Sequence, residues 1–207
     1  MFLKEGFHRA TTREIARRAG ISQGSIFTYF KDKEEILFHI FSRQHERAVE
    51  RILTVLGQQL AEATCTDTDP EQVFVSVFAT LLRTVDEQRR FILLVYQETK
   101  SLNQQARQAL IAGDKRLQAL LSEAIRYGVE RGRFAPDHIE LKAHNLLALA
   151  HTWATRHWAY AGVLDTIEDY IAFLQPQVLA MLGTRTAAVT PKTARPPTPT
   201  ERPTVAK

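Results

Sequence analysis

Apolar residues recur at steps of three and four along most of this 207-residue chain, which is the period of amphipathic α-helices. The pattern predicts one long helix from residue 33 to about residue 63, followed by a polar loop over residues 64–70. The same spacing of apolar residues predicts a helix starting at residue 69 or 70 and another marked by apolar residues between 91 and 102. It also predicts helices over residues 104–131, 137–161 and 166–182. We therefore expect an all-α protein.

The stretch 11–33 differs from the rest, because it predicts two short helices joined by a tight turn. Thr12 can cap the first helix, and Gly20 can end it, since a residue without a Cβ readily adopts the left-handed conformation. Ser22 then caps a second helix over residues 23–30. This arrangement is typical of a helix-turn-helix, whose second helix enters the major groove of DNA.

The outward side of this second helix is short of charge and rich in hydrogen-bonding and flat groups. Gly24 allows close approach to the bases, and Gln23 can bond adenine. Phe27 or Thr28 can contact a thymine methyl group. Hydroxyl and ammonium groups on the flanks suit phosphates, which position a protein without reading sequence. The candidate phosphate contacts are Thr12, Ser25, Tyr29 and Lys33. The alternative is an ordinary helical hairpin with a solvated charged face.

At these positions the chain resembles the TetR family of one-component transcriptional repressors. The residues in register with the family pattern are Thr11, Thr12, Ile15, Ala16, Ala19, Gly20, Ile21, Ser22, Gly24, Tyr29, Phe30 and Lys33, followed by Glu34, Glu35 and Ile36. The resemblance implies a base-facing set of Arg13, Gln23, Gly24, Phe27 and Thr28, with Phe27 standing where the family often has Tyr. It also implies that residues 1–6 are the last turn of a helix whose earlier turns are missing here, so that the first helix of the unit is truncated. Three explanations stay open at this point: a start codon assigned too late, a trimmed chain, or a DNA-binding domain that is weakened.

Charge is concentrated at the two ends of the chain. Residues 1–33 carry seven Lys and Arg against three Asp and Glu, residues 34–183 carry fifteen against nineteen, and residues 184–207 carry five against one. Residues 1–33, which include the predicted helix-turn-helix, thus carry excess positive charge, while residues 34–183 carry excess negative charge. This distribution favours steering of residues 1–33 toward DNA phosphates, although charge alone does not separate DNA from other polyanions. The tail has five prolines and little apolar surface, so it cannot offset the entropy of ordering.

The expected organisation has three parts. A helix-turn-helix DNA-binding domain occupies residues 1–45, a helical effector-binding and dimerisation domain occupies residues 46–183, and a disordered, Pro-rich basic tail occupies residues 184–207. The last two predicted helices, the second capped by Asp165, carry apolar surface on more than one face, which implies burial against a second copy. Proteins of the TetR family, which this chain resembles, form homodimers through these two C-terminal helices. The DNA-binding helices of the two subunits would then bind half-sites about 34–36 Å apart on a near-palindromic operator of double-stranded DNA.

Polar residues stranded on apolar helices are candidates for a small-molecule effector site, because buried polar groups need partners. The candidates are Tyr96, Lys100, Arg126, Tyr127, His144, His151, Trp153 and Arg156. The alternative for each is a satisfied core or interface group, which is the commoner place for a histidine on an apolar helix. Segments such as LVYQETKSL and LALAHTWATRHWA are similar to regulators of fatty-acid and steroid catabolism. This resemblance implies an acyl-CoA effector, with Lys100, Arg126 or Arg156 near its polar end.

Other classes of function find little support in the sequence. It holds no Gly-rich phosphate loop, nucleophile elbow or metal triad, so we expect neither an enzyme nor a bound cofactor or metal. The lone Cys65 is expected to be an inert loop thiol, and with no signal peptide or membrane-length apolar run the protein is expected to be cytoplasmic. One alternative stays open: a helical ligand- or partner-binding protein that has lost DNA binding with its first helix.

Overall fold

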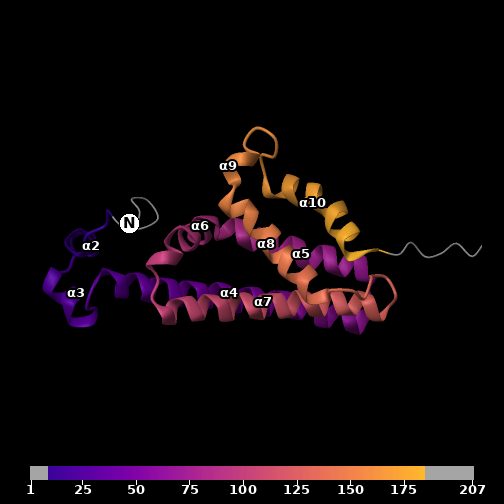
Figure 1. The fold of residues 1–207 in the computed structure, drawn as a ribbon, viewed down its shortest axis with the longest axis horizontal. Coiled ribbons are helices and arrows are strands. Elements are labelled where there is room, and N and C mark those ends of the chain that lie inside the picture. The colour runs from indigo at the N-terminus through magenta and orange to yellow at the C-terminus, as the bar shows by residue number, and fades with distance from the viewer. Residues whose placement is uncertain (1–8, 185–207) are drawn as a thin grey trace, which may run out of the picture.

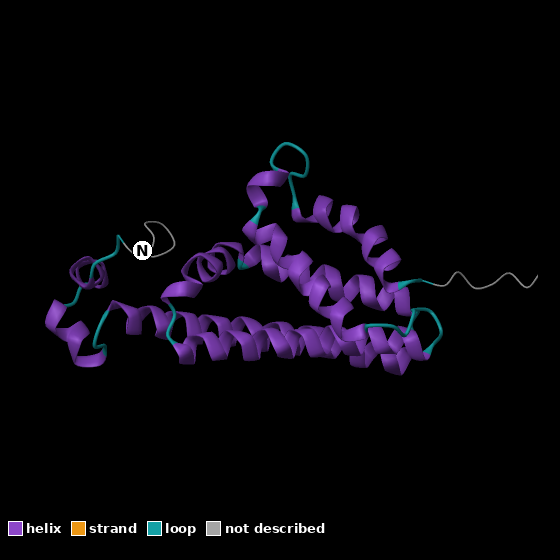
Figure 2. Ribbon diagram, in the orientation of Figure 1, coloured by secondary structure: helices purple, strands orange, loops and turns teal. Residues whose placement is uncertain are grey.

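The computed structural model describes residues 9–184, which form an elongated assembly of α-helices (Figure 1). No strand occurs within this range, as Figure 2 shows. The all-α prediction is therefore confirmed for the described part of the chain. The predictions of a truncated first helix and of a disordered tail lie outside these residues.

Two short helices form one end of the molecule, α2 (Thr12–Ala19) and α3 (Gln23–Tyr29). Gly20 ends α2 in the left-handed conformation, with φ at 70°. Ser22 caps α3, because its hydroxyl accepts a hydrogen bond from the Ser25 amide at 3.0 Å. The predicted helix, turn and helix are therefore present.

The first cap lies one residue earlier than predicted. The hydroxyl of Thr11 accepts a hydrogen bond from the Glu14 amide at 3.2 Å, and Thr11 has an extended backbone. Thr12 is already the first helical residue, and its hydroxyl instead accepts a hydrogen bond from the Gln23 side-chain amide at 3.1 Å. The Thr12 hydroxyl therefore links the two helices and caps neither.

The helix α4 (Lys33–Thr66) leaves this unit and runs along the whole body. Asp32 caps it by accepting a hydrogen bond from the Glu35 amide at 2.7 Å. The helix continues three residues past its predicted end, so the loop shortens to residues 67–69. The exposed Cys65 therefore lies in a helical turn, and its prediction as a loop residue was wrong.

The rest of the body is built from the helices that follow α4 in the chain. They are α5 (Pro70–Glu87), α6 (Arg89–Glu98), the short η1 (Thr99–Ser101), α7 (Gln104–Glu130), α8 (Ile139–Thr155), α9 (His157–Tyr160) and α10 (Ile167–Leu182). Figure 1 shows α4 and α7 side by side along one edge, with α5 and α8 above them and α10 outermost. Burial of their apolar faces creates one shared core.

The predicted helix over residues 137–161 is interrupted. Its backbone leaves the helical conformation at Arg156 (φ −122°), which separates α8 from α9. The break lets the ring of Tyr160 stack on Trp153, with centroids 5.7 Å apart, while Tyr170 of α10 stacks on the same indole at 5.0 Å. Aromatic packing across three segments therefore overrides the helical period.

The cap of α10 also differs from prediction, because it is Thr166 and not Asp165. The Thr166 hydroxyl accepts a hydrogen bond from the Asp169 amide at 3.1 Å, and the Asp169 carboxylate accepts one from the Thr166 amide at 2.9 Å. This reciprocal pair is a capping box, which satisfies two amides that would otherwise lack partners.

A second, smaller apolar cluster joins α2, α3 and the start of α4 to α6 and α7. Ile26 of α3 and Leu37 of α4 are buried there with Phe91 and Leu94 of α6. The helix-turn-helix formed by α2 and α3, called the reader below, is therefore joined to the body through this cluster as well as through α4.

Candidate DNA-binding and effector sites

The outward side of α3 is exposed to solvent. Gln23, Gly24 and Thr28 are exposed, Phe27 is 50% exposed and Tyr29 is 77% exposed. Ile26, on the opposite side, is buried and anchors the helix to the second cluster. The structure therefore has the outward, uncharged face on α3 that the sequence predicts.

Side-chain hydrogen bonds hold this face in place. Besides the bond between Gln23 and Thr12, the Thr28 hydroxyl donates to the Gly24 carbonyl at 3.2 Å. The hydroxyls of Ser22 and Ser25 lie 2.8 Å apart. An amide side chain has two donors and a two-fold acceptor, so Gln23 keeps capacity for a base edge.

The basic residues near α3 divide into two groups. Arg17 and Arg18 bond the Glu14 carboxylate at 2.6 Å and 3.0 Å, and these guanidinium groups hold the Glu14 pKa at about 2. Arg13 is exposed on α2, and Lys33 is half-buried in the first turn of α4. Arg13 and Lys33 therefore lie on the two helices that precede and follow α3 in the chain.

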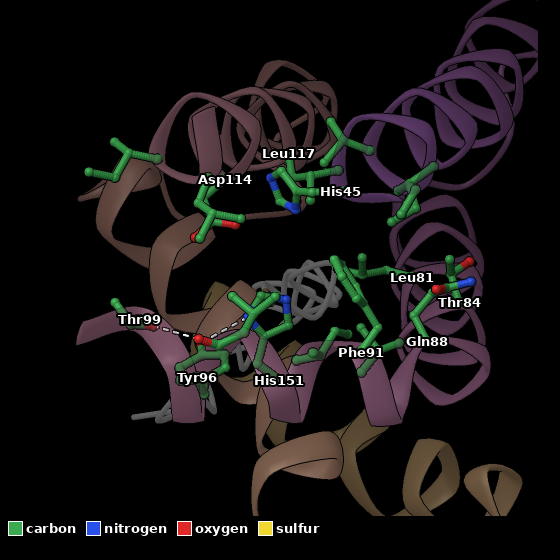
Figure 3. Close-up of a pocket in the computed structure, with 18 of the residues that line it drawn as sticks. His45, Leu81, Thr84, Gln88, Phe91, Tyr96, Thr99, Asp114, Leu117 and His151 are labelled. Atoms are coloured by element: carbon green, nitrogen blue, oxygen red, sulfur yellow. Dashed lines mark hydrogen bonds between the residues drawn. The ribbon is translucent and has the colours of Figure 1, made fainter. Parts of the chain in front are cut away.

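A cavity of about 230 Å³ lies in the body, between α4, α5, α6, α7 and α8 (Figure 3). Most of its wall is apolar, and the side chains that form it include Val49, Leu81, Phe91, Leu110 and Leu117. Apolar walls with a few placed polar groups are typical of small-molecule sites.

Among the polar side chains that line this cavity, four come from four different helices. His45 comes from α4, Tyr96 from α6, Asp114 from α7 and His151 from α8. Figure 3 shows His45 and Asp114 on one side of the hollow, with Tyr96 and His151 on the other. The Tyr96 hydroxyl and His151 Nδ1 are 3.0 Å apart, within hydrogen-bond distance.

The protein around these groups disfavours their charged forms. Burial lowers the pKa of His151 to about 4, with a smaller contribution from His45, and burial also lowers the pKa of His45. Burial is likewise the main cause that raises the pKa of the Asp114 carboxyl, although one edge of Asp114 meets solvent. A base with a lowered pKa loses its proton at a lower pH, so the His151 imidazole is neutral at pH 7.

An outer groove adjoins the cavity between α7 and α8. Tyr96, Asp114 and His151 border both the cavity and the groove. Lys115 and His144 border the groove but not the cavity. A ligand could therefore place an apolar group in the cavity and a polar one in the groove.

Three of the eight predicted effector residues come together here, namely Tyr96, His144 and His151. Two others are aromatic residues that find partners in the core. The Tyr127 hydroxyl lies 3.0 Å and 2.8 Å from the carbonyls of Ala63 and Thr68. Trp153 donates its indole N–H to Asp86 at 2.7 Å.

The three predicted cationic residues also lie away from both hollows. Arg126 pairs with Glu140 at 2.6 Å on the surface. Lys100 is exposed in η1, and Arg156 is exposed at the break between α8 and α9. The cations that do border the hollows are Arg107 and Lys115.

Sequence reasoning missed His45, Asp114 and Arg107. For His45 the sequence did offer a signal of a pocket residue, because it is a polar residue four positions before Val49 on the apolar stripe of α4. Within residues 9–184, no group of three or more His, Cys, Asp and Glu side chains is placed to hold a metal. No described helix is long and apolar enough to cross a membrane.

Comparison with known proteins identifies related chains for both parts of the molecule. Residues 1–40 match the family model described as bacterial regulatory proteins, tetR family, and residues 67–165 match the tetracyclin repressor-like C-terminal domain. The chain is 27% identical over 197 residues to the HTH-type transcriptional regulator HbdR of Aromatoleum sp. (strain CIB), covering 94% of this chain and 82% of that protein.

Solved structures share the fold. A tetR-family regulatory protein from Rhodococcus RHA1 superposes with a TM-score of 0.72 at 20% identity, covering 89% of this chain and 92% of that one. FadR from Bacillus subtilis, solved in complex with stearoyl-CoA, superposes with a TM-score of 0.62 at 19% identity, covering 87% and 91%. At these identities the likeness concerns the fold.

Proposed function

We propose that this chain, which belongs to the TetR family of bacterial regulatory proteins, is a homodimeric repressor that a small hydrophobic effector releases from a palindromic operator. Family membership makes it a DNA-binding transcriptional regulator. The proposal that an effector controls DNA binding rests on the course of α4. This helix begins directly after α2 and α3 and forms part of the cavity wall through His45 and Val49.

The proposed DNA contacts follow from the exposed side of α3. Gln23 and Thr28 would meet base edges, with Gly24 allowing the backbone to approach and Phe27 contacting a thymine methyl group. Arg13 on the neighbouring helix would join them. Phosphates would be held by Thr12, Ser25, Tyr29 and Lys33, which fix the register without reading sequence.

Dimerisation is proposed through α8 and α10. The outward side of α8 exposes Leu141 and Ala148, and that of α10 exposes Ala172, Phe173 and Ala180. The apolar side chains supply surface to bury, and the three alanines let helices approach closely. A two-fold interface of this kind would present two α3 helices to two half-sites.

Release is proposed to be a population shift. A ligand that binds the cavity better in one position of α4 favours that position, and α4 then changes the separation of the two readers. α6 would act in parallel, since Phe91 lies both in the cavity wall and in the cluster that holds the reader. A coupling of about 1–3 kcal/mol is enough for partial release.

For the effector we propose an acyl-CoA with a compact acyl group. The support is the fold likeness to FadR, which was solved with stearoyl-CoA, and the outer groove that would take a polar portion. The cavity of about 230 Å³ lies below the roughly 300–1,000 Å³ of pockets that hold drug-sized ligands. A thermal-shift series of acyl-CoAs should therefore show the largest stabilisation for short or branched acyl groups. Stabilisation by a different class of compound, with no response to any acyl-CoA, would remove this proposal.

Substitutions on the two contact sets should have different consequences for DNA binding. Gln23→Ala or Thr28→Ala is expected to reduce discrimination between the preferred and a mismatched duplex by about 1–3 kcal/mol, because a base contact is lost. Lys33→Ala is expected to weaken all duplexes about equally and to reduce the salt slope by about 1, because a phosphate contact is lost. Fluorescence anisotropy against the DNA upstream of the reading frame, at several salt concentrations, measures both quantities.

Arg90→Ala provides a control, since it removes an exposed cation of α6 that we assign to neither set. It should leave both discrimination and salt slope unchanged. A change of sequence preference caused by Lys33→Ala would contradict the division of contacts. Absence of salt-sensitive, sequence-selective binding would instead favour the alternative, a ligand- or partner-binding protein that no longer binds DNA.

A further inference from the structure

The cavity and the outer groove meet at a boundary that three helices form. The side chains that border both of them are Tyr96 of α6, Ile111 and Asp114 of α7, and His151 of α8. A ligand that places an apolar group in the cavity and a polar portion in the groove must cross this boundary. The groups at the boundary therefore decide which chemical link between the two portions is accepted.

Two of the three polar side chains at the boundary are partners of each other. The Tyr96 hydroxyl lies 3.0 Å from His151 Nδ1, and the two rings pack edge-on with their centroids 5.8 Å apart. Asp114, in contrast, makes no hydrogen bond or ion pair with another residue of the described range. Its carboxylate is therefore the group at the boundary whose charge no close protein partner compensates.

The Asp114 carboxylate acts on the boundary itself. Figure 3 shows the side chain directed from α7 toward the cavity, with Tyr96 and His151 on the other side. Its negative charge also contributes, after burial, to the raised pKa of the Tyr96 hydroxyl. One edge of Asp114 meets solvent, so its charge is partly screened and still reaches the space that a ligand would cross.

The neighbouring cations border either the groove or the cavity. Lys115 and His144 border the groove but not the cavity. Arg107 lines the cavity about two helical turns before Asp114, and its guanidinium donates a hydrogen bond to the Leu102 carbonyl at 3.4 Å. An anionic group is therefore favoured in the groove beside Lys115 and disfavoured at the boundary, where it would meet a like charge.

We propose that Asp114 is a specificity-determining residue of the effector site, where its carboxylate excludes the free carboxylate of a compact acid and so selects an uncharged conjugate of that acid, such as a thioester or an amide. The inference rests on the proposed function, because it assumes that the effector occupies the cavity and crosses into the groove. It gives the regulator a means to respond to the activated acid and to ignore the free one.

A pair of probes tests the proposal on the full chain. Cyclohexanecarboxamide and cyclohexanecarboxylate have the same number of non-hydrogen atoms and nearly the same shape, and at pH 7 they differ by one negative charge. Calorimetry should show tighter binding of the amide by at least about fivefold, which is the effect of a unit charge about 4 Å away in bulk water. The less polar surroundings of the cavity make this a lower bound.

Substitution of Asp114 supplies the decisive comparison, because hydration of the carboxylate probe also contributes to the ratio in the unaltered protein. Asp114→Asn removes the charge at nearly constant size and should reduce the amide-to-carboxylate ratio by at least about fivefold. Asp114→Glu keeps the charge and should retain most of the ratio. Glu123→Gln removes a negative charge from an exposed position of α7 outside the cavity and the groove, and should leave the ratio unchanged.

The outcomes separate this inference from the proposed function. A preference for the carboxylate, or a ratio that Asp114→Asn leaves unchanged, would overturn the assignment of Asp114. Failure of both probes to bind at millimolar concentration, while an acyl-CoA still stabilises the protein, would also overturn it and leave the acyl-CoA proposal intact. Binding of the unaltered protein to DNA, measured separately by anisotropy, tests the repressor function. A ratio lost in Asp114→Asn, in a protein that never binds DNA, would support Asp114 and remove the repressor.

Discussion

A protein in which Leu141 and Phe173 are both replaced by arginine is expected to be monomeric and to bind its operator at least about 100-fold more weakly, because the two half-sites are no longer bound by one linked molecule. Both residues lie on the exposed outward sides of α8 and α10. Facing a second copy, the new guanidinium groups would be buried without partners, at a cost larger than a small interface can supply. Sedimentation velocity and fluorescence anisotropy measure the two effects.

The added positive charge makes this a stringent test, since cations by themselves strengthen binding to DNA. Gln58→Arg adds a cation to the exposed surface of α4, which runs along the other side of the molecule from α10 (Figure 1). That control should remain dimeric and bind at least as tightly as the unaltered protein. If the double variant stayed dimeric with unchanged operator affinity, the dimer interface would have to lie elsewhere.

Replacing Gly128 with alanine is expected to destabilise the protein by about 1–3 kcal/mol, the usual cost of overpacking a core. A Cβ at this position of α7 would overlap the ring of Phe134, which is 1% exposed and packs edge-on against Phe74 at 6.0 Å. The ring has no free space to enter, so the helix or the loop after it must shift. Urea unfolding followed by circular dichroism measures the change in the free energy of unfolding.

Gly57→Ala is the matched control. Gly57 lies inside α4, and a Cβ there would meet nothing within 4 Å. Alanine loses less entropy than glycine in a helix, so this variant should be more stable by about 0.5–1 kcal/mol. Equal stabilities of the two alanine variants would show that the core around Phe134 is looser than described.

Much of this fold is predictable from the spacing of apolar residues, because a helix of several turns repeats its signal many times. Single caps are harder to predict. Thr11 and Thr12 offer identical hydroxyls, and only the extended backbone of Thr11 decides between them. The break at Arg156 leaves no trace in the period either, since it depends on the stacking of Tyr160 and Trp153 between segments.

The effector site was predicted only in part, for a related reason. Tyr127 and Trp153 have the polar and aromatic character of pocket residues, but the fold supplies them with partners in backbone carbonyls and in Asp86. His45 carries only a weak sequence signal, because a single polar residue on the apolar stripe of a long helix does not by itself indicate a pocket. Its burial depends on Gly113, which is brought opposite by the packing of α7 on α4. Such pairings come from tertiary contacts and are not visible in local spacing.

We expect two copies of the exposed face of α3 to read DNA as a symmetric pair. This is tested by selection of bound duplexes from a pool with a randomised central region, followed by sequencing. The expected result is enrichment of an inverted repeat whose half-sites are centred about one helical turn, roughly 10 base pairs, apart, or a multiple of that. Enrichment of single, unpaired sites, or no enrichment at any salt concentration, would contradict it.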